Sequence, residues 1–207
     1  DVSEAGAEVA RAVAEHAARS GLATISGAAR GVDQLAMGAA LELDGSVVGV
    51  TTEGVRKVGR SADIRRLLTE DRICIVSPYA PDVGFTPANA MARNKIIYAL
   101  AGATVVVASA EGSGGTWSGA IEAIRSRYSP VLVWRGDGEG EGNEELVKRG
   151  GRAIQSAGEA VDAALGIVEQ QRQAVEEVDR PVGDDRPGEE RDVPFPGEHD
   201  AADIAAL

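Results

Sequence analysis

The 207-residue sequence predicts an α/β fold, with a doubly wound and mostly parallel sheet covered by helices on both faces. Short apolar runs alternate with longer stretches in which apolar residues recur at helical spacing, which is the pattern of repeated strand–helix units. The run over 104–109 contains three consecutive valines, typical of a strand buried on both faces. Aromatic residues make up only 3% of the chain, so we expect a core of Ala, Val, Ile and Leu.

The chain opens with a stretch over residues 3–20 in which Ala and Val recur every three or four positions, which predicts an amphipathic helix. Ser3 is the expected N-cap of this helix. A short strand over 22–26 and a helix over 32–43 follow. A Rossmann-like unit normally enters on a strand, whereas this chain enters on a helix, so a first strand upstream of Asp1 is expected.

The alternation continues through the middle of the chain. The predicted elements are, in order, a strand over 46–51, a helix over 61–71, a strand over 73–77, a helix over 88–100, a strand over 104–109 and a helix over 116–127. Cys74 lies in an apolar run, so a buried structural thiol is expected. A single cysteine fits a reducing cytoplasm, the predicted location.

A strand over 130–134, a helix over 143–149, an edge strand over 153–155 and a helix over 157–173 complete the predicted domain. Asp, Glu, Arg, Pro and Gly then dominate. Residues 167–207 contain 12 acidic and 4 basic residues, so they carry most of the net charge of −12. The sequence therefore predicts a Rossmann-like domain over 1–170 and a disordered acidic tail over 171–207.

Charge and motif content exclude several classes of function. An acidic body argues against duplex binding through a broad basic face. The chain has no phosphate-binding Walker loop, no cluster of metal ligands and no Ser-His-Asp set. We therefore expect that the protein holds no cofactor or metal and that it is not an enzyme. No apolar run reaches the roughly 18 residues of a membrane span, so no membrane association is expected.

Basic residues are concentrated between Arg56 and Arg72, where six fall within 17 positions. This cluster has two possible interpretations. It is either a solvated helix face or one wall of a phosphate-binding surface.

Two glycine-bearing turns stand where predicted strands end and helices begin. Ser26-Gly27-Ala28-Ala29-Arg30-Gly31 follows the first strand, and Gly112-Ser113-Gly114-Gly115-Thr116 follows the valine strand. Backbone N–H groups converge on anions at such positions in α/β sheets. The Ser26 hydroxyl, the amides of residues 27–30 and the Arg30 guanidinium are candidate phosphate ligands, as are Ser113, Gly114, Gly115 and Thr116. The glycines could equally serve only to close the turns.

Between the two turns, three polar residues, Arg93, Asn94 and Lys95, interrupt an otherwise apolar helix. They are further candidates for phosphate binding, unless they form a solvent-facing polar stripe. Arg93 and Lys95 are separated by about 200° around a helix, so at most one of them can point at a ligand. Asp33 is expected to cap the helix that follows the first turn.

The order of these motifs resembles the DprA/Smf DNA-processing family. The similarity covers about residues 3–135 and is carried by Ser26–Asp33, by Arg93-Asn94-Lys95-Ile96-Ile97, and by the valine strand with its glycine-rich helix start. The resemblance implies an extended Rossmann fold that binds single-stranded DNA, forms a homodimer and passes the strand to a RecA-type recombinase in DNA recombination or natural transformation. It places DNA phosphates at the candidate residues above. The family's Gly-Ser-Arg turn ahead of the first helix is absent from this sequence.

Two other functions remain open from the sequence. One is a nucleotide-sensing domain of the same Rossmann-like superfamily. The other is a nucleotide phosphoribohydrolase, because Gly114-Gly115-Thr116 is similar to the glycine-rich loop of those enzymes. Their catalytic glutamate stands three residues after the Thr, where this chain has Gly119, and Glu122 follows one turn later.

Overall fold

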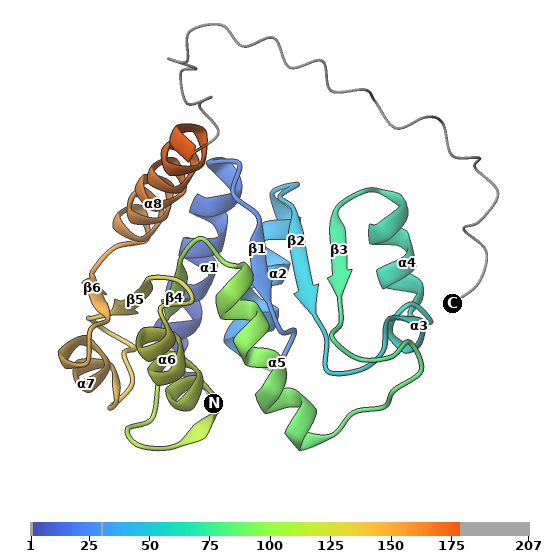
Figure 1. Cartoon of the computed structure of the whole chain (residues 1–207), viewed down its shortest axis with the longest axis horizontal. Helices are drawn as coiled ribbons and strands as arrows, with labels where there is room; N and C mark the ends of the chain where they lie inside the picture. The colour runs from blue at the N-terminus through green and yellow to red at the C-terminus, as the bar shows by residue number, and fades with distance from the viewer. Residues whose placement is uncertain (1, 30, 179–207) are drawn as a thin grey trace, which may run out of the picture.

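The computed structural model describes residues 2–29 and 31–178 and confirms the α/β class. Helices and strands alternate along the chain (Figure 1). Their order is α1 (Glu4–Arg19), β1 (Thr24–Ser26), α2 (Val32–Glu42), β2 (Val47–Val50), α3 (Val55–Val58), α4 (Ala62–Thr69), β3 (Ile73–Val76), α5 (Pro87–Leu100), β4 (Thr104–Val106), α6 (Gly114–Ser126), β5 (Val131–Trp134), α7 (Asn143–Lys148), β6 (Arg152–Ile154) and α8 (Ala157–Val178). Every predicted helix and strand is present within a few residues, and the short α3 is the addition.

All strand pairings are parallel, as predicted, but the strands form two sheets. The first sheet has the order β1-β2-β3 and the second the order β4-β5-β6. Among the described strands, β1 and β4 each pair on one side only. Their other edges face each other across the middle of the molecule (Figure 1).

Helices cover both faces of the two sheets. On one face of the first sheet, Met37 and Ala40 of α2 and Leu67 of α4 pack on Val47 and Ile73. In the second sheet, successive residues of each strand point to opposite faces, and helices cover both faces. Val106, Val131 and Val133 pack with Tyr98 of α5 and with Trp117, Ala120 and Ala123 of α6, whereas Leu132 and Ile154 pack with Ala160 and Ala163 of α8.

Cys74 is exposed, so the prediction of a buried thiol was wrong. The register explains this exposure. Cys74 pairs with Val48, and its side chain points to the face opposite Ile73, which α2 and α4 cover. The helix on the Cys74 side, α5, contacts β1 and β2 and leaves the edge strand β3 uncovered.

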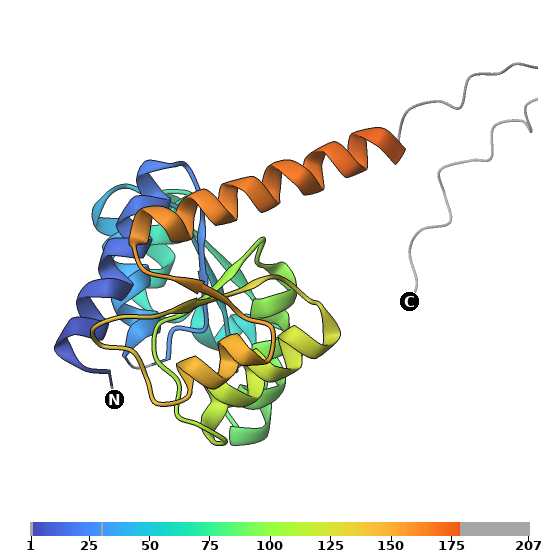
Figure 2. The same ribbon diagram turned by 90° about the vertical axis from the view of Figure 1, so that its left-hand side faces the viewer.

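α8 is longer than the sequence predicted. It begins against α1 and continues away from the body as far as Val178, eight residues past the predicted domain end (Figure 2). The rest of the predicted acidic tail, 179–207, lies outside the described residues. No helix in the described part of the chain combines the length and the apolar character needed to cross a membrane.

Candidate functional site

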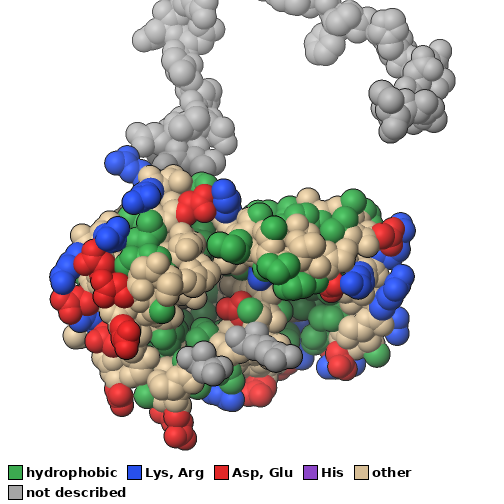
Figure 3. Space-filling view, turned by 90° about the horizontal axis from the view of Figure 1, so that it is seen from below, with side chains coloured by type: hydrophobic (Ala, Val, Ile, Leu, Met, Phe, Trp, Pro, Cys, Tyr) green, Lys and Arg blue, Asp and Glu red, His purple; other side chains and the backbone are tan. Residues whose placement is uncertain are grey.

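A cleft opens at the carboxyl ends of β1 and β4, where the two glycine-bearing turns meet. It continues inward between the two sheets as one cavity of about 1010 Å³. Ser26 and Asp33 line it from the first turn, Asn94 from α5, and Gly115 and Thr116 from the second turn. Figure 3, which looks onto this end of the molecule, shows a surface hollowed near its centre. The structure thus brings together one residue set that is dispersed over 90 positions of sequence.

The amides of the first turn are already hydrogen-bonded. The Asp33 carboxylate accepts hydrogen bonds from Gly27 N at 3.2 Å and from Ala29 N at 3.3 Å. Gly31, at φ 93°, is the N-cap of α2 and provides no side chain, so the expectation that Asp33 caps this helix was wrong. Asp33 instead bonds back to the turn before the helix. An incoming phosphate would have to compete with this carboxylate for both amides.

Arg93 is buried beneath the first turn. The residue is 5% exposed, and Nη1 donates to the carbonyl oxygen of Val50 at 2.6 Å. A Cβ placed on Gly27 would lie 1.8 Å from Arg93 Nη1, so only glycine allows this packing. Burial lowers the pKa of Arg93, while the charge of Asp33 acts in the opposite direction. The interpretation of Arg93 as part of a solvent-facing stripe is therefore excluded.

The second turn differs because its helix start carries no capping side chain. Ser113 is the N-cap of α6 but makes no side-chain hydrogen bond to the helix. Gly112 and Gly114 have φ values of 69° and 86°, in the left-handed region that favours glycine, and added Cβ atoms there would meet nothing within 4 Å. Among the described residues, no side chain occupies the first amides of α6. These amides are available to a ligand.

Asn94 and Lys95 differ in position. Asn94 lines the cleft, and its Nδ2 would be 3.5 Å from a Cβ on Gly115, so it lies directly beside the start of α6. Lys95 turns outward and pairs with Glu122 at 2.9 Å, which raises the pKa of Lys95. The helical spacing correctly predicted that Arg93 and Lys95 would not face the same ligand. Glu122, the residue on which the phosphoribohydrolase alternative depends, is this surface partner of Lys95.

Asn143, which the sequence analysis did not single out, supports the second turn from below. It is fully buried, and Nδ2 donates to Val107 O and Trp134 O, both at 2.8 Å, while Oδ1 accepts from Ser109 N at 2.9 Å. All of its amide-group contacts therefore join the ends of β4 and β5. In the sequence, Asn143 stands at the start of the predicted helix over 143–149, after the acidic glycine-rich stretch 136–142. Nothing in this position indicated its role.

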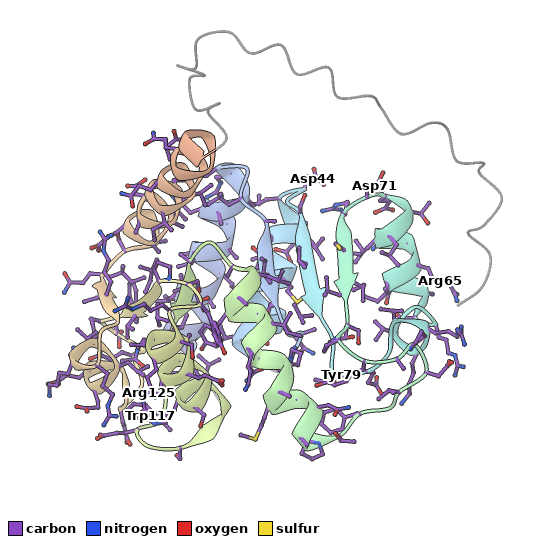
Figure 4. All side chains as sticks on the ribbon, in the orientation of Figure 1. Asp44, Arg65, Asp71, Tyr79, Trp117 and Arg125 are labelled. Carbon is purple, nitrogen blue, oxygen red and sulfur yellow. The ribbon has the colours of Figure 1, made fainter. Side chains whose placement is uncertain are left out.

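The basic cluster between Arg56 and Arg72 lies on and around α3 and α4, and none of its members lines the cleft. Arg56 pairs with Asp82, Lys57 with Glu53, and Arg66 with Glu70, all at the surface. Arg65 lies on the outer side of α4, far from α6, which carries Trp117 and Arg125 (Figure 4). The solvated-face interpretation is the one that this placement supports.

Two further predictions concern ligands. Arg30 lies outside the described residues, so its role stays a prediction. Within the described ranges, no group of three or more His, Cys, Asp or Glu residues could hold a metal ion. Arg93 is the single Lys or Arg among the described residues that line the cleft, and Asp33 is the single acidic residue.

Comparison with solved structures shows the same fold in proteins that include the following three. DNA processing protein A from Streptococcus pneumoniae is 26% identical, with a TM-score of 0.64, over 78% of this chain and 57% of that protein. The Helicobacter pylori protein of the same name, described with a single-stranded DNA binding mode, is 21% identical, with a TM-score of 0.65, over 80% of this chain and 76% of that one. The molybdenum cofactor carrier protein of Chlamydomonas reinhardtii is 16% identical, with a TM-score of 0.57, over 82% and 91%.

The chain thus spans just over half the length of the Streptococcus pneumoniae protein. Comparison with proteins of curated function gave no match. A sequence model of the DNA recombination-mediator protein A family matches residues 1–164, which include both glycine-bearing turns and the polar residues of α5. The chain therefore belongs to the DNA recombination-mediator protein A family.

Proposed function

We propose that this chain binds single-stranded DNA, with a backbone phosphate at the start of α6. Membership of the recombination-mediator family and the single-stranded DNA binding described for the Helicobacter pylori relative support the choice of ligand. The observation that carries the proposed position is the helix start at Gly114, which opens on the cleft without a capping side chain.

The physical basis is the unsatisfied N-terminus of a 13-residue helix. The first N–H groups of a helix have no partner within the helix, and the aligned peptide dipoles favour negative charge there. The glycines at 112, 114 and 115 let a phosphate approach the backbone closely. The amide of Asn94 and the hydroxyl of Thr116, both on the cleft wall, supply neutral hydrogen-bond donors beside it.

The first turn has a different part in this proposal. Ser26 lines the cleft, whereas the amides of Gly27 and Ala29 are bonded to Asp33 and Gly27 is packed against Arg93. We therefore assign to this turn the shaping of the cleft wall, with the Ser26 hydroxyl as its direct contact. The predicted DNA contacts of Gly27, Arg93 and Lys95 would each require an existing contact to break: the packing of Gly27 against Arg93, or the ion pair of Lys95 with Glu122.

The proposal is of a binding protein without catalysis. From the family resemblance we also propose that the chain forms a homodimer and that a RecA-type recombinase is its partner. Size-exclusion chromatography with light scattering tests for the homodimer, and co-precipitation with a purified recombinase tests for the partner.

The decisive experiment compares oligo-dT with mononucleotides. Fluorescence anisotropy of a labelled oligo-dT strand should rise with protein at low salt. Asn94→Ala should weaken this binding by about fivefold to tenfold, the loss of one hydrogen bond of about 1 to 1.4 kcal/mol. Asn89→Ala is the matched control, because Asn89 lies on the same helix outside the cleft, and its printed hydrogen bonds to Tyr79 and Thr86 use only its backbone.

Two results would contradict the proposal. The first is the absence of any anisotropy change at low salt. The second is a gain in melting temperature with a mononucleotide and none with oligo-dT, which would favour the nucleotide-sensing alternative.

A further inference from the structure

Two large apolar residues are exposed to solvent at the start of α5. Met91 and Phe85, at 61% and 59%, have the highest exposed fractions among the large hydrophobic residues that the structure describes. Phe85 directly precedes the N-cap Thr86, and Met91 lies in the second turn of the helix. Figure 3 shows hydrophobic side chains beside the hollow. Single exposed hydrophobic residues are common on proteins, whereas a pair with this exposure beside a cleft indicates a binding role.

Met91 connects this surface to the proposed phosphate position. It precedes Asn94 by three residues, so the two side chains lie on one face of α5, about 4.5 Å apart along the helix axis. Both residues line the cleft, and Asn94 lies directly beside the start of α6. Successive nucleotides of a strand are spaced by about 3.4 Å or more. A strand with one phosphate at the start of α6 therefore brings a neighbouring base over Met91.

The backbone on both sides of Phe85 is held by hydrogen bonds. Phe85 N donates to the Glu53 carboxylate at 3.2 Å, and the Thr86 hydroxyl accepts from Asn89 N at 3.0 Å. A hydrophobic staple would bury Phe85 against Ala90, the fourth residue of the helix, so a staple does not account for the exposure of Phe85. Because the backbone is already fixed, little conformational entropy is lost when a flat ligand stacks on this ring.

The surroundings of Phe85 fit a nucleic acid strand better than a protein partner. The Glu53 carboxylate that accepts the Phe85 N–H is also paired with Lys57, so it presents no unpaired negative charge to a phosphate. A stable protein interface buries about 800 Å² on each partner, which needs a broad apolar area. Here two separate apolar side chains stand with small and polar residues between them. A thioether and an aromatic ring each accept one base, whatever its identity.

We propose that Met91 and Phe85 form a base-stacking platform on which the bound strand leaves the cleft. One base lies on the Met91 side chain, and a base further along the strand stacks on the Phe85 ring. This inference rests on the proposed binding of single-stranded DNA, to which it adds contacts with bases. The platform recognises the flat faces of bases, which are accessible in a single strand and covered by neighbouring base pairs in a duplex.

The experiment compares oligo-dT with an abasic strand of the same length, which keeps the phosphates and lacks the bases. Phe85→Ala should weaken the binding of oligo-dT by about fivefold to tenfold and Met91→Ala by about threefold, while both variants bind the abasic strand like the wild type. Phe85→Trp should retain the affinity for oligo-dT. Leu100→Ala is the matched control, because Leu100 is an exposed apolar residue at the other end of α5 and lies outside the cleft.

The outcomes separate the platform from the proposed function. If the wild type binds oligo-dT and both alanine variants bind it equally well, the platform is overturned and the phosphate site stands. An equal loss of affinity for oligo-dT and for the abasic strand would also overturn the platform, because it would show that the variants disturb phosphate binding. Absence of binding of either strand by the wild type would overturn the proposed function and, with it, this inference.

Discussion

The two glycine-bearing turns have similar sequences but differ in the structure: side chains of the protein fill the first turn, and none caps the helix start of the second. In the first, Asp33 occupies two amides and Arg93 fills the space over Gly27. In the second, the start of α6 has no capping side chain, and added Cβ atoms at Gly112 and Gly114 would meet open space. The comparison teaches that a glycine next to a helix start has two distinct uses. It can admit a side chain of the same protein, or it can leave the backbone accessible to a ligand.

The largest expected effect concerns the support of the second turn. Asn143→Ala should lower the free energy of unfolding by roughly 3 kcal/mol, because it leaves Ser109 N, Val107 O and Trp134 O buried without partners. Urea denaturation measures the loss. Asn89→Ala, at a half-buried position where only the backbone makes the hydrogen bonds to Tyr79 and Thr86, should change stability by less than about 0.5 kcal/mol. A similarly small loss for Asn143→Ala would mean that the second turn is held in place by other contacts.

Tyr98 links α5 to α6 behind the second turn and provides a pH test. Burial raises the pKa of Tyr98 to about 12, above its ordinary value of 10.0. Since the unfolded chain ionises this phenol first, stability is fully present below pH 10 and is lost as the pH rises from 10 toward 12. The expected loss is roughly 2.7 kcal/mol, from about two pKa units at 1.36 kcal/mol each.

Urea denaturation of the wild type and of Tyr98→Phe at several pH values from 9 to 12 isolates this effect. The phenylalanine variant lacks the ionising group, so its stability should fall less over this range. Parallel curves for the two proteins would show that Tyr98 ionises in the folded state as readily as in the unfolded one.

Substituting alanine for one glycine in each turn tests the comparison directly. Gly27→Ala should cost roughly 2 kcal/mol, since its Cβ would displace the buried Arg93 guanidinium. Gly112→Ala should cost about 1 kcal/mol, from left-handed backbone strain without a clash. Thermal unfolding ranks the two variants. The reverse ranking would show that Arg93 can move aside and that the first turn is as adaptable as the second.

The smallest expected effect is on the carboxylate that closes the first turn. Asp33→Ala should cost about 1 kcal/mol and free the amides of Gly27 and Ala29. The two turns should then behave alike toward anions, so inorganic sulfate should raise the melting temperature of this variant more than that of the wild type. An equal response of both proteins to sulfate would mean that Asp33 does not control access to these amides.

The sequence was sufficient to predict the strands and most helices. It was insufficient to predict which side chains of the site are buried and which are exposed. Valine runs and helical periodicity predicted every strand and every helix except the short α3, because local pattern determines which segments can be buried on one face or on two. The same logic failed for Cys74, since an apolar run does not tell which strand lies at an edge. Helical spacing separated Arg93 from Lys95. It did not tell that Arg93 is the buried one, because the partner, Val50 O, lies 43 residues away in the sequence.

α8 gives the molecule a natural position for a reporter. With 22 residues it is about 33 Å long, and only its first half packs against the body (Figure 2). It lines the cavity between the two sheets and points away from the turns where the ligand is proposed to bind. A dye or an affinity tag attached at its carboxyl end therefore lies away from the cleft. It can report on the rotational diffusion of the protein without contacting a ligand bound in the cleft.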